Sequence, residues 1–126
     1  MQYLLHQSIQ RAAERYPQRP AFRFLDQQLD YALLAERVQQ LARVLREQGV
    51  RRGDRVALYL NKSLESAVAI YGIMCAGAAY VPLDPGAPAG RLAGMLRGCG
   101  VRCLVSHEAK RADLMALLRQ PTPIEA

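Results

Sequence analysis

The sequence predicts an α/β fold, namely a parallel-sheet β-α-β-α-β-α subdomain preceded by a helix and a small β-hairpin. Three short apolar runs, at residues 56–60, 80–81 and 101–105, alternate with segments of helical pattern. Strands that alternate with helices favour parallel pairing, with right-handed crossovers. A chain of 126 residues has the size of one domain and can bury a core.

The first element is predicted to be an amphipathic helix that ends before Pro17, because the residue before a proline disfavours the α conformation. Apolar residues recur on one face at helical spacing, while polar residues occupy the other face. These apolar residues are Leu5, Ile9, Ala12 and Tyr16. Residues 21–24 then alternate like a half-buried strand, and a turn at 26–27 leads into a short strand at 28–29.

The second helix is predicted to begin after Asp30, whose side chain is a good N-cap, and to end at Gly49. It carries an apolar stripe flanked by charged residues. The stripe consists of Leu34, Val38, Leu41 and Leu45. A polar turn at 51–54 follows and leads into the strand at 56–60.

The third helix is predicted to run from the N-cap Ser63 to Met74 and to stop at Gly77, since glycine adopts the left-handed conformation without a Cβ clash. This helix is apolar on nearly every side, which is typical of a buried helix. A short buried strand at 80–81 should follow. Pro82 should end its ladder, because proline has no N–H to donate.

The C-terminal third is predicted to contain a rigid loop at 85–88, a helix at 89–97, the strand at 101–105 and a final helix at 109–118. Glycines recur every fourth residue, at 90, 94 and 98, and this spacing favours close packing on one side of the helix. Pro121 and Pro123 indicate a linker or a frayed terminus.

Composition excludes several classes of function. The net charge is +6, but the basic residues are scattered from Arg11 to Arg119 without interleaved aromatics, so nucleic-acid binding is not expected. No apolar run approaches the ~20 residues of a membrane span. The N-terminus lacks the pattern of a signal peptide, and three cysteines argue against a disulfide framework. The expected location is therefore cytoplasmic.

Three patterns that resemble chemical sites are better explained structurally. Cys99, Cys103 and His107 provide only three of the four ligands that a structural zinc site uses, so no metal site is predicted. Lys62-Ser63 lies between a strand and a helix but lacks the glycines of a phosphate loop, which favours a cap and a solvated charge. Asp84 follows a strand end, where ligands bind in open sheets, but aspartate before proline is also common in turns. No catalytic triad or carboxylate pair is apparent.

Residues 76–85, Ala-Gly-Ala-Ala-Tyr-Val-Pro-Leu-Asp-Pro, closely resemble the second core motif of the AMP-forming acyl-CoA synthetase and adenylation-domain superfamily. Residues 29–34 resemble its first core motif, with Asp30 where Thr or Ser is usual, and residues 53–57 fit the segment before its first parallel strand. The resemblance covers nearly the whole chain. The superfamily's phosphate loop, later ATP motifs and catalytic-lysine domain are not found in it. The resemblance therefore implies that residues 1–126 are the N-terminal part of the large domain of a longer enzyme.

The resemblance implies two-step carboxylate activation, in which a carboxylic acid and ATP with Mg²⁺ form an acyl-adenylate and a thiol then takes the acyl group. An AMP-forming acyl-CoA ligase using coenzyme A is the first expectation. The alternative is a nonribosomal-peptide-type adenylation domain that loads the phosphopantetheine of a carrier protein. A hypothesis of another class is a non-catalytic assembly or binding module. The 126 residues alone should be inactive, and they should self-associate through an open sheet edge or face.

In acetyl-CoA-synthetase-like relatives, arginines in the segment after the third strand contact the phosphate of coenzyme A. By this resemblance Lys110 and Arg111 are candidate contacts to that phosphate. The alternative is that both residues decorate the surface of the last helix.

Overall fold

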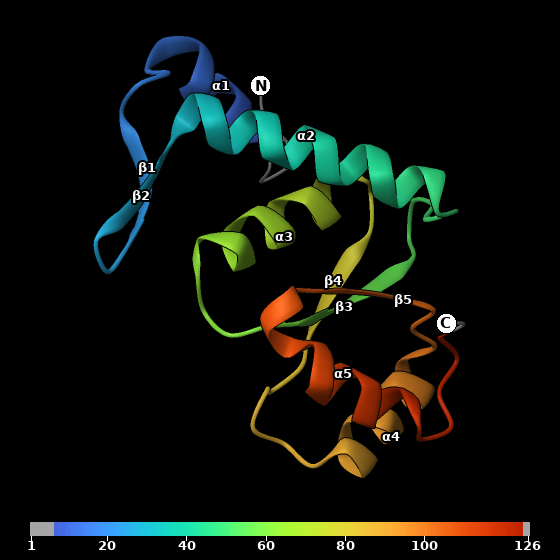
Figure 1. The fold of residues 1–126 in the computed structure, drawn as a ribbon. Coiled ribbons are helices and arrows are strands. Elements are labelled where there is room, and N and C mark those ends of the chain that lie inside the picture. Colours follow the sequence, from blue (N-terminus) through green and yellow to red (C-terminus); the bar gives the residue numbers. More distant parts are fainter. Residues whose placement is uncertain (1–6, 125–126) are drawn as a thin grey trace.

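The computed structural model describes residues 7–124, so Leu5 of the predicted first helical stripe lies outside the described residues. Five α-helices, five strands and one 3₁₀ turn follow one another within this part of the chain. Figure 1 shows how the helices and strands are arranged. Their bounds are α1 (Gln7–Arg15), β1 (Pro20–Phe24), β2 (Gln27–Asp30), α2 (Tyr31–Glu47), β3 (Arg55–Tyr59), α3 (Leu64–Cys75), β4 (Ala79–Pro82), α4 (Ala89–Cys99), β5 (Cys103–Ser106), η1 (Glu108–Lys110) and α5 (Arg111–Leu118).

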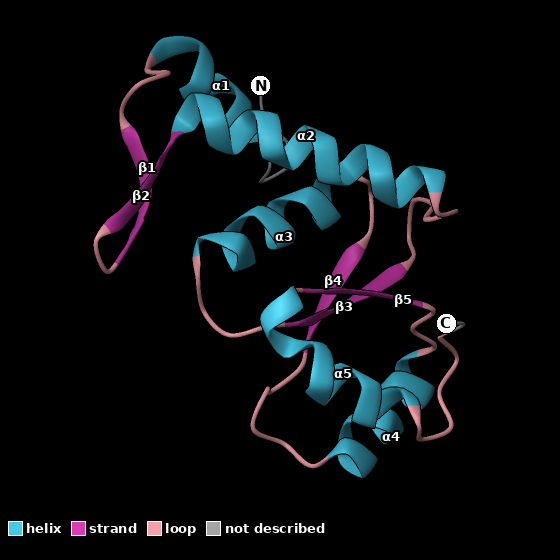
Figure 2. Cartoon of the chain, in the orientation of Figure 1, coloured by secondary structure: helices cyan, strands magenta, loops and turns pink. Residues whose placement is uncertain are grey.

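The predicted α/β class is confirmed. Strands β3, β4 and β5 form a parallel sheet in the order β4-β3-β5, and β1 pairs with β2 as an antiparallel hairpin. Helices α2 and α3 lie on one side of the parallel sheet, and α4 and α5 lie on the other (Figure 2). Successive side chains of β3 point to opposite faces of the sheet and so contribute to both cores. Val56 packs in the core with α2 and α3, and Ala57 and Tyr59 pack in the core with α4 and α5.

Local signals set the start of α2 and α3 as predicted. Asp30 Oδ1 accepts a hydrogen bond from Leu33 N at 2.8 Å. Ser63 and Ser66 cap α3 reciprocally, each side chain accepting from the other residue's backbone N–H. Gly77 ends the turn after α3 with a φ of +88°, in the left-handed region that favours glycine.

The prediction of a buried strand at 80–81 is wrong. β4 is an edge strand, and Tyr80 is 40% exposed. Pro82 does not end the ladder either, because it pairs in register with Leu58, and Leu83 N still donates to Leu58 O at 3.0 Å. The N–H groups of successive residues point to opposite sides of a strand. Because Leu83 N points toward β3, the nitrogen of Pro82 points away from it, toward the open edge, where no donor is needed.

Packing of α4 also differs from the prediction. A Cβ added at Gly90 or Gly98 would meet no atom within 4 Å, so the glycine side of α4 is open and not closely packed. Burial falls instead on another face of the helix. That face consists of Leu92, Ala93 and Leu96.

Several boundaries shift by a few residues. The hairpin turn consists of Leu25 and Asp26, one residue earlier than predicted, because Phe24 pairs with Gln27. Tyr16 was expected on the apolar stripe of α1 but follows the helix and is 44% exposed. The segment after α5 folds back, since Pro121 O accepts from Arg97 Nη1 at 2.5 Å and Ile124 packs against the α4–α5 core. The predicted linker or frayed end is therefore not seen up to residue 124.

Candidate functional site

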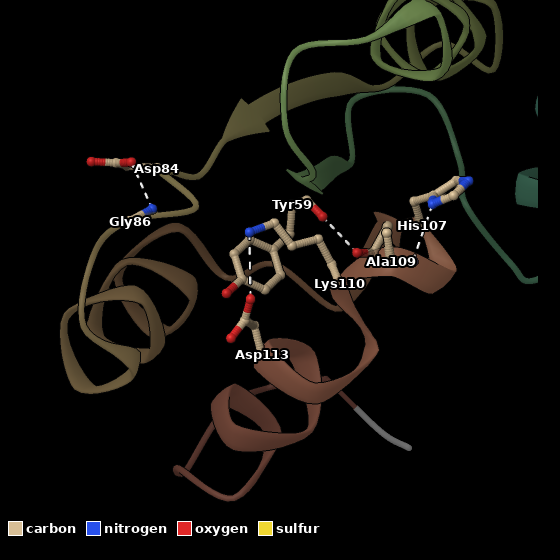
Figure 3. Close-up of polar contacts among 8 residues, drawn as sticks. Tyr59, Asp84, Gly86, His107, Ala109, Lys110 and Asp113 are labelled. Atoms are coloured by element: carbon tan, nitrogen blue, oxygen red, sulfur yellow. Dashed lines mark hydrogen bonds and ion pairs between the residues drawn. The ribbon is translucent and has the colours of Figure 1, made fainter.

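The three parallel strands end at one edge of the sheet, which we call the carboxyl edge. Open α/β sheets bind their ligands in this position, because the loops after the strands converge there. In Figure 3 polar side chains from the ends of β3 and β5, from η1 and from α5 gather at this edge, with the loop after β4 nearby. The labelled ones are Tyr59, Asp84, His107, Lys110 and Asp113.

Lys110 is the centre of this polar group. Its Nζ lies 3.4 Å from Asp113 Oδ2 and 5.9 Å from the centre of the Tyr59 ring. Only 14% of the Lys110 side chain is exposed, against 59% for Asp113. An ammonium over an aromatic face is attracted by the ring quadrupole. The ammonium is therefore held by a carboxylate and a ring and does not extend freely into water.

Tyr59 was not singled out from the sequence, where it belongs to an apolar run. It is 3% exposed, and Ser106 Oγ donates to its carbonyl oxygen, which joins the ends of β3 and β5. Burial is the main reason why its pKa is raised above the ordinary value; Asp113 raises it further and Lys110 opposes the shift. The phenol thus stays neutral over the physiological range and offers an O–H donor. Its signal in the sequence was a side chain with a polar tip near the C-terminal end of an apolar run.

Arg111 follows Lys110 in the chain but has different surroundings. Its guanidinium pairs with Glu108 at 2.9 Å, and the two side chains are 73% and 77% exposed. Such exposed pairs contribute little to stability because water and salt screen them. Of the two predicted phosphate contacts, Arg111 is therefore the one that solvent reaches readily.

Asp84 and His107 both act in turns. Asp84 Oδ1 accepts from Gly86 N at 2.9 Å, and His107 Nδ1 accepts from Ala109 N at 3.1 Å, which caps η1 (Figure 3). Within residues 7–124 no group of three His, Cys, Asp or Glu side chains is placed to hold a metal ion. Burial raises the pKa of the Cys103 thiol, against a smaller opposing effect of a hydrogen bond with Leu104, and so disfavours the thiolate that metals bind.

Two backbone donors at the N-terminus of α3 are used within the capping box. The side chain of Ser63 accepts from Ser66 N at 3.2 Å, and Ser66 Oγ accepts from Ser63 N at 3.0 Å. These two donors are therefore used within the cap, as predicted for Lys62-Ser63.

Comparison with known proteins gives consistent relatives. The sequence profile of the family described as AMP-binding enzyme matches residues 9–125. Tyrocidine synthase 2 of Brevibacillus parabrevis is 42% identical over 110 residues, which cover 87% of this chain and 3% of that protein. Surfactin synthase subunit 3 of Bacillus subtilis (strain 168) is 38% identical over 84% of this chain and 8% of its own length.

Solved structures agree with this result. The nonribosomal peptide synthetase FmoA3, bound to α-methyl-L-serine-AMP, superposes with a TM-score of 0.87 at 33% identity and covers 98% of this chain and 14% of its own. A putative long-chain-fatty-acid CoA ligase from Rhodopseudomonas palustris gives a TM-score of 0.85 at 24% identity, with 97% of this chain and 31% of its own covered, which shows a shared fold. The chain thus spans only a small part of its relatives. Since the family profile matches almost its whole length, the chain belongs to the AMP-binding enzyme family.

Proposed function

We propose that this chain is the N-terminal part of the large domain of an enzyme that activates a carboxylic acid with ATP. The observation that carries the proposal is the family match over residues 9–125, which includes both core motifs. In the reaction, a carboxylate oxygen attacks the α-phosphorus of ATP and pyrophosphate leaves. A thiol then attacks the acyl-adenylate carbonyl, and AMP leaves as the thioester forms.

The relatives favour a carrier-loading adenylation domain over the acyl-CoA ligase that the sequence analysis placed first. Peptide synthases are 38 to 45% identical to the chain, whereas the CoA ligase of known structure is 24% identical. The acceptor thiol would then be the phosphopantetheine of a carrier protein. The acid activated by a carrier-loading adenylation domain would be an amino acid. The acyl-CoA ligase remains the alternative.

The described residues do not themselves fit the ATP phosphates. The capping box uses donors at the start of α3, and no glycine-rich loop precedes that helix. We therefore assign no nucleotide contact to residues 7–124 and expect the nucleotide and its Mg²⁺ to bind other segments of the enzyme. What the described part supplies is the sheet, with Tyr59, Lys110 and Asp113 held at its carboxyl edge.

The coenzyme A contact remains a proposal. Arg111 fits a phosphate better than Lys110, because its guanidinium is exposed and only an exposed carboxylate holds it. If the acceptor is coenzyme A, Lys110→Ala/Arg111→Ala in the full-length protein should raise the KM for coenzyme A and leave pyrophosphate exchange unchanged. Arg119→Ala, directly after α5, is a control that removes one positive charge elsewhere. An unchanged KM for coenzyme A would return both residues to the helix surface.

Acid-dependent exchange of labelled pyrophosphate into ATP tests the proposal in the full-length natural protein. Amino acids and fatty or aryl acids are screened, and the active acid is then offered with coenzyme A or with a phosphopantetheine-loaded carrier protein. Exchange with an amino acid, followed by carrier loading, is the expected result. No exchange with any acid would favour the non-catalytic assembly module. The isolated 126 residues should show no exchange, since they span a small share of any relative.

We propose a cytoplasmic location, and the cysteines support it. Cys75, Cys99 and Cys103 are free thiols, as is usual in the reducing cytoplasm. Among the described residues, no helix has both the length and the apolar character that crossing a membrane requires.

A further inference from the structure

We propose that a basic hollow beside α1 is a docking surface for an acidic segment of a protein partner. The hollow has a volume of about 770 Å³ and lies where the C-terminal half of α1 meets the start of β1 and α2. We call it the arginine hollow. It is lined by Arg11, Ala12, Glu14, Arg15, Tyr16, Arg19, Pro20 and Tyr31.

Three arginines that look scattered in the sequence meet at this hollow. Arg11 and Arg15 are four residues apart on α1 and so share one helix face, where like charges destabilise a helix. Arg19 arrives from the loop after α1, and its guanidinium lies 4.2 Å from the centre of the Tyr16 ring. Within the described part of the chain no salt bridge joins any of the three to a carboxylate, and Glu14 is the one acidic residue in the lining. The repulsion is thus not relieved within the described chain.

The chemistry of the lining indicates the kind of ligand. Guanidinium groups bind carboxylates through paired, parallel hydrogen bonds. Tyr16 is 44% exposed, and arginine and tyrosine are the side chains enriched at the energetic centres of protein interfaces. The hollow therefore offers aromatic contact area as well as charge, a combination that suits an acidic peptide segment.

A protein partner fits better than a nucleic acid. The related synthases carry this segment as 1 to 8% of their length, so in those proteins it belongs to a much longer chain. Other arginines of the described structure are distributed over separate elements; for example, Arg43 lies on α2, Arg91 on α4 and Arg119 after α5. A nucleic-acid site would need a continuous basic stripe. This inference is independent of the proposed enzymatic activity.

Figure 1 shows that α1 and the start of α2 lie on the side of the molecule remote from α4 and α5. Variants in the hollow therefore leave the carboxyl edge intact. The test uses a fluorescein-labelled deca-glutamate peptide and measures its anisotropy as the protein is added at about 50 mM salt, where screening is weak. Arg11→Gln/Arg15→Gln/Arg19→Gln is compared with Arg43→Gln/Arg91→Gln/Arg119→Gln, which removes the same charge elsewhere.

The hollow variant should raise the Kd at least about tenfold, because three exposed ion pairs are lost together, whereas the control should change it less than about twofold. Tyr16→Ala should also weaken binding, although it changes no charge. Equal losses in the two triple variants, or no saturable binding to the wild type, would overturn the proposal.

Two further measurements keep the result specific. Backbone amide NMR signals of residues 11–16, 18 and 19 should shift on addition of the peptide, while shifts centred elsewhere would contradict the assignment. A labelled single-stranded DNA of equal charge should bind more weakly than the peptide. If it binds as tightly, the surface is a general polyanion site and the assignment to an acidic protein segment is wrong.

Discussion

The contact between α2 and α3 gives the most direct test of the fold. Gly72 is buried in α3, facing Leu41 of α2. A Cβ added at Gly72 would lie 2.7 Å from Leu41 Cδ2 and 3.0 Å from both Leu41 Cβ and Cγ. Carbon atoms normally pack about 3.5–4.0 Å apart. A rotation can remove Cδ2, but it does not move Cβ, which is fixed to the backbone of α2.

Gly72→Ala should therefore destabilise the protein even though alanine is the better helix former. Overpacking of this kind costs about 1–3 kcal/mol. The gain in helix propensity offsets about 1 kcal/mol of that cost. We therefore expect a net loss of about 1 kcal/mol in the free energy of unfolding. The loss should be smaller if the two helices separate slightly to make room for the added Cβ.

Gly94→Ala is the matched control, since it makes the same change inside α4. Its Cβ would meet only Arg97 Nη2, at 3.8 Å, an ordinary contact. This variant should gain up to about 1 kcal/mol from helix propensity. Urea unfolding followed by circular dichroism measures both variants, and Leu41→Ala/Gly72→Ala completes a double-mutant cycle that should recover part of the loss. If Gly72→Ala is as stabilising as Gly94→Ala, the close approach of α2 and α3 is wrong.

Other changes test other parts of the fold. Gly77→Ala should lower the free energy of unfolding, measured with urea, by about 1–2 kcal/mol, because a residue with a Cβ is strained at a left-handed φ. The added Cβ would also lie 3.3 Å from Arg52 Cα. An unchanged stability would contradict the left-handed turn at Gly77. Ser63→Ala should cost about 1 kcal/mol by the same measurement because the cap is lost, and an unchanged stability would contradict the capping role of Ser63. The pKa of Tyr59 is raised above 10.0, so the neutral form is favoured by folding, and stability present below pH 10 is lost as the pH rises through the raised pKa. Tyr59→Phe should show a shallower loss than wild type above pH 10; parallel curves would refute this reasoning. Light scattering over a concentration series should show self-association of the 126 residues, since both edges of the described sheet are open, and a strict monomer would contradict it.

Local chemistry made much of this fold predictable. The caps at Asp30 and Ser63 depend on hydrogen bonds that span three residues, and the Gly77 turn depends on the conformation of one residue. The alternation of apolar runs and helices also fixed the parallel sheet, because strands joined by a helix must cross over. These features need no information from distant parts of the chain.

The errors share a different cause. Whether β4 is central or lies at an edge depends on which strands flank it, and an apolar run looks the same in both positions until its neighbours are known. Pro82 carried the correct hint, since proline in a sheet favours an edge strand. The glycine spacing on α4 showed that one side is bare, but it did not show whether another element approaches that side.

The candidate sites were hardest to predict because each joins residues from separate elements. Tyr59 meets Lys110 only because β3 lies beside β5, and η1 follows β5 directly. Arg19 joins the α1 arginines only because the chain turns back after α1, where Arg19 O accepts from Tyr31 N at 3.0 Å. The two groups also belong to different cores, because Tyr59 packs in the α4–α5 core while Ile9 of α1 packs in a separate cluster with Leu29 and Leu34. If the docking proposal fails, the family assignment and the description of the carboxyl edge therefore still hold. If the full-length enzyme is inactive, the proposal for the arginine hollow still stands until its own binding test is made.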